Sequence, residues 1–299
     1  MSMWLLVTLS RILVANGIFP IILKLNVGLP LRTKRFTFMF FFCLVFAIIV
    51  ANIISPLMIS YTTAIILGVG FVNGLAAYAQ WRAIDISLSK DSLFTFFDDI
   101  IAMGLSYFVL NEGQYLKSWT YVGISLSVGA VIIFTIHSYR RNKSNNSNTT
   151  PLRFFLYVGF YSVVWGVAVF LMRYFGVAGL SIGSFLVPWY TGAFIAAVAL
   201  LLTVKDPAET ATNTKLKIGD ISWMFLLAIL IFVSLALGYK AYCLAPQNIV
   251  QPFFLIGEMI FPALIGLYIF SEIKGLDKVE KIVFTCAIIG GIIIAINNI

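Results

Sequence analysis

Residues 31–54 read LRTKRFTFMFFFCLVFAIIVANII, in which a basic pentapeptide is followed by a long apolar run. The run from Phe36 to Ile54 has no charged side chain, and it is close to the about 20 residues that an α-helix needs to cross the hydrocarbon layer of a bilayer. Lysine and arginine beside such a run are typical of a short loop at a membrane surface. The stretch therefore predicts a transmembrane helix that begins after Arg35.

The composition of the whole chain matches this stretch. Of its 299 residues 61% are hydrophobic and only 11% are charged, and the mean hydropathy is +1.00. Soluble domains carry about 25% charged residues, so this chain cannot cover a water-facing surface, and lipid is its expected solvent. The formal net charge is +8, but the basic residues lie in short loops between apolar runs, which predicts no nucleic-acid partner.

Ten apolar runs predict ten transmembrane helices. Charged or turn-forming residues separate most of them, such as Lys205-Asp206-Pro207. The breaks near Ser55-Pro56 and Ala245-Pro246 are the weakest. The predicted spans are 3–25, 36–54, 61–84, 91–110, 118–138, 152–173, 180–204, 219–243, 247–270 and 278–297.

One connecting segment differs from the other loops. Residues 139–151 read YRRNKSNNSNTTP, which is polar and ends in proline. We interpret this segment as a flexible linker. It divides the chain into an N-terminal half, 1–138, and a C-terminal half, 152–299, each with five predicted spans.

The two halves match at an offset of 160 residues. Because each half has an odd number of spans, consecutive halves must have opposite topologies in the membrane, as in the inverted repeats of secondary transporters. The sequence therefore predicts an all-α membrane protein whose ten transmembrane helices form two inverted five-helix repeats around a central cavity. The matched positions are Asp98 with Glu258, Gln80 with Lys240, and 108–112 with 268–272.

Ionisable residues inside a membrane span are costly and are therefore candidates for a functional site. Asp98 and Glu258 lie deep in the fourth and ninth spans, and Lys240 lies near the end of the eighth. We expect them to line the cavity, where an acid could bind a substrate ammonium group or a coupling proton. The alternative is that Asp98 or Glu258 pairs with Lys240 or Arg11 and only fixes helix packing. Asp99 lies about 100° further round the helix, so both aspartates can point inward only obliquely. The other expected cavity-lining residues are Gln80, Trp81, Tyr78 and Tyr239.

Two further acids lie at helix ends. Glu112 and Glu272 end their spans beside loops, where we expect a structural role in bonding neighbouring backbone amides. The chain has a single histidine, His137, and no CxxC, HExxH or phosphate-binding glycine-rich loop. These absences predict no catalytic residues, no metal and no cofactor, and they argue against an enzyme.

These acids carry a family resemblance. The steps Leu110-Asn111-Glu112 and Phe270-Ser271-Glu272, the pairs Asp98-Asp99 and Glu258-Met259, and Trp165-Gly166 resemble the repeat of the drug/metabolite transporter superfamily, EamA type. The resemblance covers nearly the whole chain. It implies ten helices in two inverted halves and a solute permease, and it implies cytoplasmic termini, whereas the lysine and arginine distribution of the loops predicts both termini outside.

The expected function is transport of a small metabolite or drug-like solute by alternating access, with proton coupling preferred. The alternative is a non-transporting membrane scaffold or a lipid-handling protein with the same fold. The expected partners are the lipid bilayer and a small-molecule substrate, and the chain is expected to be a monomer or homodimer. Its expected place is the plasma (inner) membrane, as a multi-pass protein.

Overall fold

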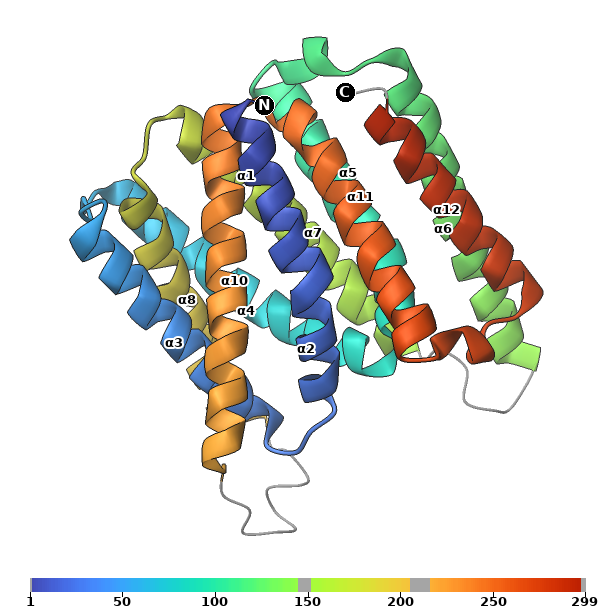
Figure 1. The fold of residues 1–299 in the computed structure, drawn as a ribbon, viewed down its shortest axis with the longest axis horizontal. Helices are drawn as coiled ribbons and strands as arrows, with labels where there is room; N and C mark the ends of the chain where they lie inside the picture. Colours follow the sequence, from blue (N-terminus) through green and yellow to red (C-terminus); the bar gives the residue numbers. More distant parts are fainter. Residues whose placement is uncertain (1, 145–151, 205–215, 297–299) are drawn as a thin grey trace. The chain divides into compact units, whose positions relative to one another are not determined.

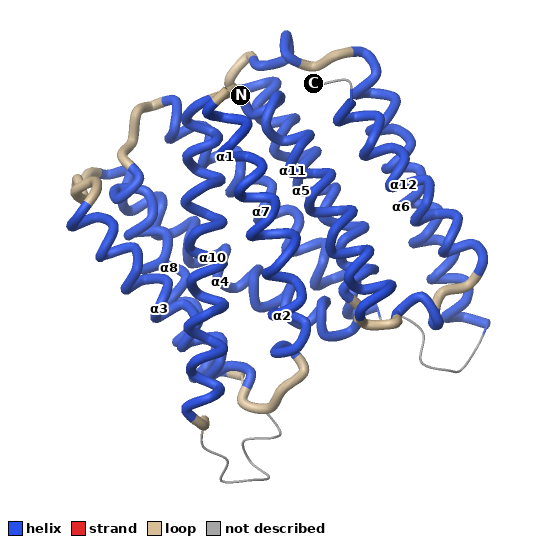
Figure 2. The backbone as a smooth tube through the Cα atoms, viewed as in Figure 1, coloured by secondary structure: helices blue, strands red, loops and turns tan. Residues whose placement is uncertain are grey.

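The structure is a computed structural model that describes residues 2–144, 152–204 and 216–296. Within these ranges the chain is helical and contains no strand (Figures 1 and 2). The α-helices are α1 Met3–Ile12, α2 Phe19–Val27, α3 Arg32–Ile53, α4 Tyr61–Ile86, α5 Leu88–Val109, α6 Ser118–Ser144, α7 Leu152–Val177, α8 Ile182–Thr203, α10 Ile218–Leu244, α11 Gln247–Leu264 and α12 Lys278–Ile296.

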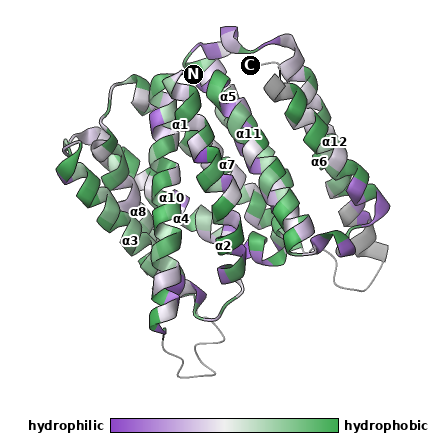
Figure 3. Ribbon diagram, viewed as in Figure 1, coloured by the Kyte–Doolittle hydropathy of each residue, from purple (hydrophilic) through white to green (hydrophobic). Residues whose placement is uncertain are grey.

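Nine helices of the described part are long and apolar enough, by length and composition, to cross a membrane. Apolar colouring dominates the helices, and hydrophilic residues gather at several helix ends and in the loops (Figure 3). The chain is therefore a multi-pass membrane protein by the properties of its helices. The tenth predicted span corresponds to α12, but its described side chains end at Ile293, which is short of a full span.

Two of the nine spans contain a π-helical segment. Residues Leu13–Ile18 join α1 to α2, and residues Ile265–Ile269 continue α11. Proline lies close to each segment, at Pro20 and Pro262. Because proline lacks an N–H group, it removes one hydrogen bond of the α-helical ladder. Single π-helical turns of this kind are frequent at functional sites.

Most helix boundaries lie within four residues of the predicted ones. Helix α3 begins at Arg32 rather than after Arg35, so the basic residues before the apolar run form its first turn. Two further differences concern the break between α4 and α5 and the end of α6. The predicted break between residues 84 and 91 is reduced to Ser87, whose hydroxyl accepts a hydrogen bond from the backbone N–H of Lys90 at 3.2 Å and so caps α5. Helix α6 extends to Ser144, so the first residues of the predicted linker, 139–144, are helical. The remainder of that linker, 145–151, lies outside the described residues.

The chain forms two compact units. The first unit contains Met1–Trp81 and Leu171–Leu244. In it α3 packs against α8 and α10, and α1 packs against α10. The hydroxyl of Thr37 donates to the carbonyl of Ala197 across the α3–α8 contact at 3.1 Å. The buried Arg35 forms an ion pair with Asp220 at 2.6 Å, which ties the start of α3 to the start of α10.

The second unit contains Arg82–Phe170 and Ala245–Ile299. Here α5 packs against α11, and α6 packs against α12, as Figure 1 also shows. The α6–α12 contact is close because small residues meet there: a Cβ at Gly290 would lie 2.9 Å from the carbonyl oxygen of Gly123. Small residues at helix contacts let backbones approach closely in membranes. A buried apolar cluster, which includes Phe94, Phe134 and Phe284, fills the unit.

Each compact unit takes helices from both sequence halves. The division at residues 139–151 describes a repeat in the sequence, whereas the compact units describe which helices pack together. The division into two sequence repeats stays a prediction, and so does the central cavity.

Two turns at an offset of 160 residues have the same backbone conformation. Asn111 follows α5 with φ 55° and ψ 34°, and Ser271 follows the end of α11 with φ 56° and ψ 25°. Each then leads into a short 3₁₀ turn, Glu112–Tyr115 and Glu272–Gly275 respectively. A left-handed residue just after a helix is a common way to end it, and it is unfavourable for a side chain such as serine.

Candidate functional site

Helices α5 and α11 run antiparallel, and they carry the acids of the predicted site in the second unit. The end of α5 meets the start of α11, because the carboxylate of Glu112 accepts the backbone N–H of Gln247 at 2.7 Å. The end of α11 meets the start of α5, because the carboxylate of Glu272 accepts the backbone N–H groups of Leu88 and Ser89 at 3.0 and 2.9 Å. The two helices are therefore held in register at both ends.

Three carboxylates gather within this helix pair. Asp98 and Asp99 of α5 and Glu258 of α11 each place an oxygen within 4.8 Å of the others. The two aspartates are buried, each 1% exposed, and Glu258 is partly buried. The structure thus brings together Asp98 and Glu258, which the offset of 160 residues matches, and it adds Asp99 to them. We call these three residues the carboxylate cluster.

The cluster is held by hydrogen bonds from its own helices. The backbone N–H of Asp99 donates to Oδ1 of Asp98 at 3.0 Å. The side-chain amide of Gln251, one of the α11 residues, donates to Oδ1 of Asp99. Oδ2 of Asp98 is buried and accepts no hydrogen bond from any described residue. One carboxylate oxygen in the middle of the membrane-spanning pair is therefore left for another partner.

Three ionised carboxylates at this spacing repel one another. At an effective dielectric constant of about 20, two unit charges this far apart repel by roughly 3 kcal/mol. Burial adds the cost of removing each charge from water. The cluster is therefore stable only when a cation or a proton compensates part of its charge. Carboxylate oxygens are suitable ligands for hard cations, and a proton bound to one of the three carboxylates would equally lower the total charge of the cluster by one unit.

Helix α7 packs tightly beside the cluster. A Cβ at Gly166 would lie 2.7 Å from the backbone carbonyl oxygen of Asp98 and 2.8 Å from Cβ of Ile101. The hydroxyl of Ser162, one turn earlier in α7, donates to the carbonyl of Phe94 at 3.3 Å. Gly166 is half of the Trp165-Gly166 step noted in the sequence. Its lack of a side chain is what allows α7 to approach α5 at the level of the cluster.

Glu112 binds the start of α11 with two of its atoms. Its carboxylate also accepts the hydroxyl of Ser106 at 2.7 Å, and its carbonyl accepts the side-chain amide of Asn248 at 3.0 Å. Glu112 is 5% exposed, and the donors from Ser106 and Gln247 both bind its Oε2. The first turn of a helix carries unpaired N–H groups and a positive dipole end, both of which favour a carboxylate.

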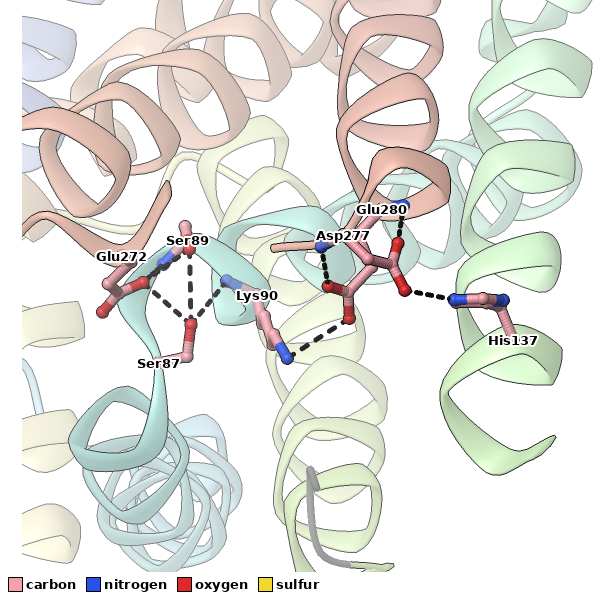
Figure 4. Close-up of polar contacts among 7 residues, drawn as sticks. All are labelled: Ser87, Ser89, Lys90, His137, Glu272, Asp277 and Glu280. Atoms are coloured by element: carbon pink, nitrogen blue, oxygen red, sulfur yellow. Dashed lines mark hydrogen bonds and ion pairs between the residues drawn. The ribbon is translucent and has the colours of Figure 1, made fainter. Parts of the chain in front are cut away.

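Glu272 has the corresponding role at the start of α5, as Figure 4 shows. Besides the two backbone amides, it accepts the hydroxyls of Ser87 at 2.8 Å and Ser89 at 2.5 Å. Lys90, which follows Ser89 in the sequence, forms an ion pair with Glu280 at 3.5 Å. His137 of α6 meets Asp277 at 2.6 Å, so the single histidine contacts an acid at the start of α12.

The other predicted site residues belong to the first unit. Tyr78 and Trp81 pack edge-on against Phe36, with ring centroids 5.4 and 5.0 Å apart. Tyr239 stacks on Phe185 with centroids 4.3 Å apart, and its hydroxyl donates to the carbonyl of Leu180 at 2.7 Å. Their contacts in this unit are those of packing residues. Gln80 is partly buried and Lys240 is exposed.

Sequence reasoning missed Gln251 and the two amides before it in α11, Gln247 and Asn248. The spacing of Gln251 and Glu258, seven residues apart, places both on one helix face, which is a signal that the sequence already contains. The contribution of Gly166 could not be foreseen, because the partner of a glycine is set by the tertiary packing of α7 on α5.

Comparison with known proteins gives a fold but no named relative. No protein-family model matches the chain, and no curated protein matches it. A solved structure described only as "Crystal structure of protein" aligns with a TM-score of 0.59 and 13% sequence identity, over 98% of this chain and 96% of the other. At that identity the similarity shows a shared fold alone.

Proposed function

We propose that the chain is a secondary transporter or facilitator of a small metabolite or drug-like solute, in the plasma membrane, and that it belongs to the EamA type of the drug/metabolite transporter superfamily. The observation that carries the proposal is the carboxylate cluster, because three acids lie together inside two membrane-spanning helices. A helix that only packs has no need for such costly groups, whereas substrate and ion pathways use them.

The local repeat supports the same proposal. The turns at Asn111 and Ser271 share their backbone angles, and the glutamate after each turn caps the helix of the other repeat. Two structurally equivalent elements that face in opposite directions are what an inverted-repeat transporter needs, since its two states are related by exchanging the roles of the repeats.

Within this proposal the cluster binds a positively charged group. The candidate occupants are a substrate ammonium group and a coupling proton, each of which would compensate the charge of Asp98, Asp99 and Glu258. The reciprocal bonds of Glu112 and Glu272 hold α5 and α11 together while the occupant changes. Gln80, Trp81, Tyr78, Lys240 and Tyr239 belong to the first unit, and their cavity-lining role stays a prediction from the sequence.

The test uses purified protein in liposomes. Amino acids, sugars and cationic drugs are offered as radiolabelled solutes, with and without a pH gradient. We expect time-dependent uptake of at least one solute class, and we expect Asp98→Asn and Glu258→Gln to reduce it at least tenfold. The matched control is Asp85→Asn, because Asp85 is an exposed acid at the end of α4.

Two results would contradict the proposal. One is folded wild-type protein that accumulates no solute of the panel above protein-free liposomes, which would favour the scaffold or lipid-handling alternative. The other is undiminished uptake by the Asp98→Asn/Glu258→Gln double variant. This result would show that transport does not need the carboxylate cluster.

A further inference from the structure

One face of α11 carries a row of polar side chains. Gln247, Gln251 and Glu258 are separated by four and seven residues, which places them on the same face of a helix. Gln251 bonds to Asp99, and Glu258 lies within the carboxylate cluster, so this face is turned toward α5. Gln247, one turn before Gln251, lies on the same face at the start of the span.

The side chain of Gln247 is buried without a protein partner. Gln247 is 0% exposed, and neither its Nε2 nor its Oε1 makes a hydrogen bond to any residue that the structure describes. The neighbouring Asn248 is also 0% exposed, and its Oδ1 has no such partner although its amide nitrogen donates to Glu112. Three amide atoms at one place thus lack the hydrogen bonds that buried polar groups normally make.

The carboxylate cluster, which includes Glu258 at the other end of the row, has the same property. Oδ2 of Asp98 is buried and accepts no hydrogen bond within the described residues. Unpartnered polar atoms therefore lie at Gln247 on α11 and at Asp98 on α5, and the hydrogen bond from Gln251 to Asp99 joins the same two helices between these positions. Leaving such atoms dry is expensive, and ordered water is the usual partner of buried groups that protein does not satisfy.

We propose that ordered water fills the α5–α11 contact beside Gln247 and connects the helix ends at Glu112 to the carboxylate cluster, so that protons reach the cluster by this route. One helix turn, about 6 Å along the axis, separates Gln247 from Gln251. That distance is roughly two hydrogen-bond lengths, and Gln251 already bonds to the cluster through Asp99.

The proton balance is simple. A proton enters from bulk water at the Glu112 end and moves along hydrogen bonds. It forms an O–H bond on one carboxylate oxygen of the cluster, whose total charge changes by one unit. The reverse path releases the proton to the same water. The inference rests on the proposed function only in treating the cluster as the place where charge is exchanged.

The test follows protonation of the cluster directly. Infrared difference spectroscopy of the reconstituted full chain records the carboxylic C=O stretch after a pH jump, and the band is assigned by its loss in Asp98→Asn and Glu258→Gln. Gln247→Leu fills the space with apolar atoms, whereas Gln247→Ala leaves room for water. We expect the band of Gln247→Leu to appear at least tenfold more slowly than that of wild type, and that of Gln247→Ala to appear at the wild-type rate or faster.

Gln114→Leu is the matched control, because Gln114 is an exposed glutamine in the turn after α5, and we expect the wild-type rate. Thermal unfolding of each variant establishes that the helix pair is intact. Equal rates in wild type and a folded Gln247→Leu would overturn the inference, as would a wild-type band that does not respond to pH. If Gln247→Leu fails to fold, a slowed band in Gln247→Ala would overturn it.

This readout needs no solute. Suppose that the carboxylic band responds to pH and slows in Gln247→Leu, but the protein transports no solute of the panel. This result would contradict the proposed function and would support the water route. Suppose instead that uptake requires Asp98 and Glu258, but the rate at which the band appears is the same in Gln247→Leu and in wild type. This result would contradict the water route and would support the proposed function.

Discussion

A Cβ atom at Gly166 would lie 2.7 Å from the backbone carbonyl oxygen of Asp98, so the position of the carboxylate cluster depends on the absence of a side chain in α7. Such a distance is too short for carbon and oxygen that are not bonded, and the two helices would have to separate. Gly166→Ala should therefore lower stability by about 1–3 kcal/mol, the usual cost of overpacking, and it should reduce solute uptake.

The control for this prediction lies in the same helix. A Cβ at Gly159 would meet nothing within 4 Å, so Gly159→Ala should change stability by no more than about 0.5 kcal/mol. Equilibrium unfolding in mixed detergent measures both variants. Equal stability of the two alanine variants would show that α7 does not press on α5 at Asp98.

Glu272 should matter for stability rather than for selectivity. It accepts hydrogen bonds from two backbone amides and two serine hydroxyls at the start of α5. Glu272→Ala leaves these donors without their partner, so we expect a loss of about 2–3 kcal/mol. Lys274→Ala, at an exposed position of the same turn, should be close to neutral. A stability of Glu272→Ala within 0.5 kcal/mol of wild type, about the scatter for surface positions, would contradict the capping role.

The Arg35–Asp220 ion pair offers a test in the first unit. Its atoms are 2.6 Å apart, and the Arg35 side chain is 5% exposed. A double-mutant cycle with Arg35→Gln and Asp220→Asn should give a coupling free energy of about 1–3 kcal/mol, the range for contacting residues. The same cycle with Lys34→Gln should be additive, because Lys34 lies about 100° round the helix from Arg35. An additive Arg35–Asp220 cycle would mean that the pair is not formed in the membrane.

Neutral replacements in the carboxylate cluster should separate function from stability. Removing one of three mutually repelling charges relieves electrostatic cost, so Glu258→Gln should raise the melting temperature or leave it unchanged while uptake falls. Functional sites often carry such a cost. If the cluster had only a structural role, Glu258→Gln would lower the melting temperature. Uptake by this variant would then fall only in proportion to the loss of folded protein.

The apolar runs predicted the membrane-spanning helices because hydropathy is a local property of the sequence. The boundary between α4 and α5 was placed less well. Asp85 and Lys90 lie in the predicted break between residues 84 and 91, but the helix restarts at once after Ser87. Part of what stabilises that restart is Glu272, which lies about 185 residues further along the chain, and no local pattern contains this information.

The candidate site was predicted in the same partial way. The repeat offset selected Asp98 and Glu258, which do lie together. Asp98 and Asp99 were expected to point inward only obliquely, because they lie about 100° apart round the helix. Gln251 of α11 nevertheless bonds to Asp99. The bonding of Glu112 and Glu272 to the opposite helix, and the grouping of helices from both halves into each compact unit, arise from tertiary packing. Helical periodicity identifies the face that a residue occupies but not the partner of that face.

The charge that moves when solute is added shows most directly whether the carboxylate cluster takes part in transport. Proteoliposomes adsorbed on a solid-supported membrane receive a solute that the wild-type protein takes up, and the transient current is recorded with and without a pH gradient. If the carboxylate cluster exchanges charge during transport, the wild-type current changes with the gradient, and the Asp98→Asn/Glu258→Gln double variant gives no current at equal protein content. An equal current from that double variant would rule out this role of the cluster.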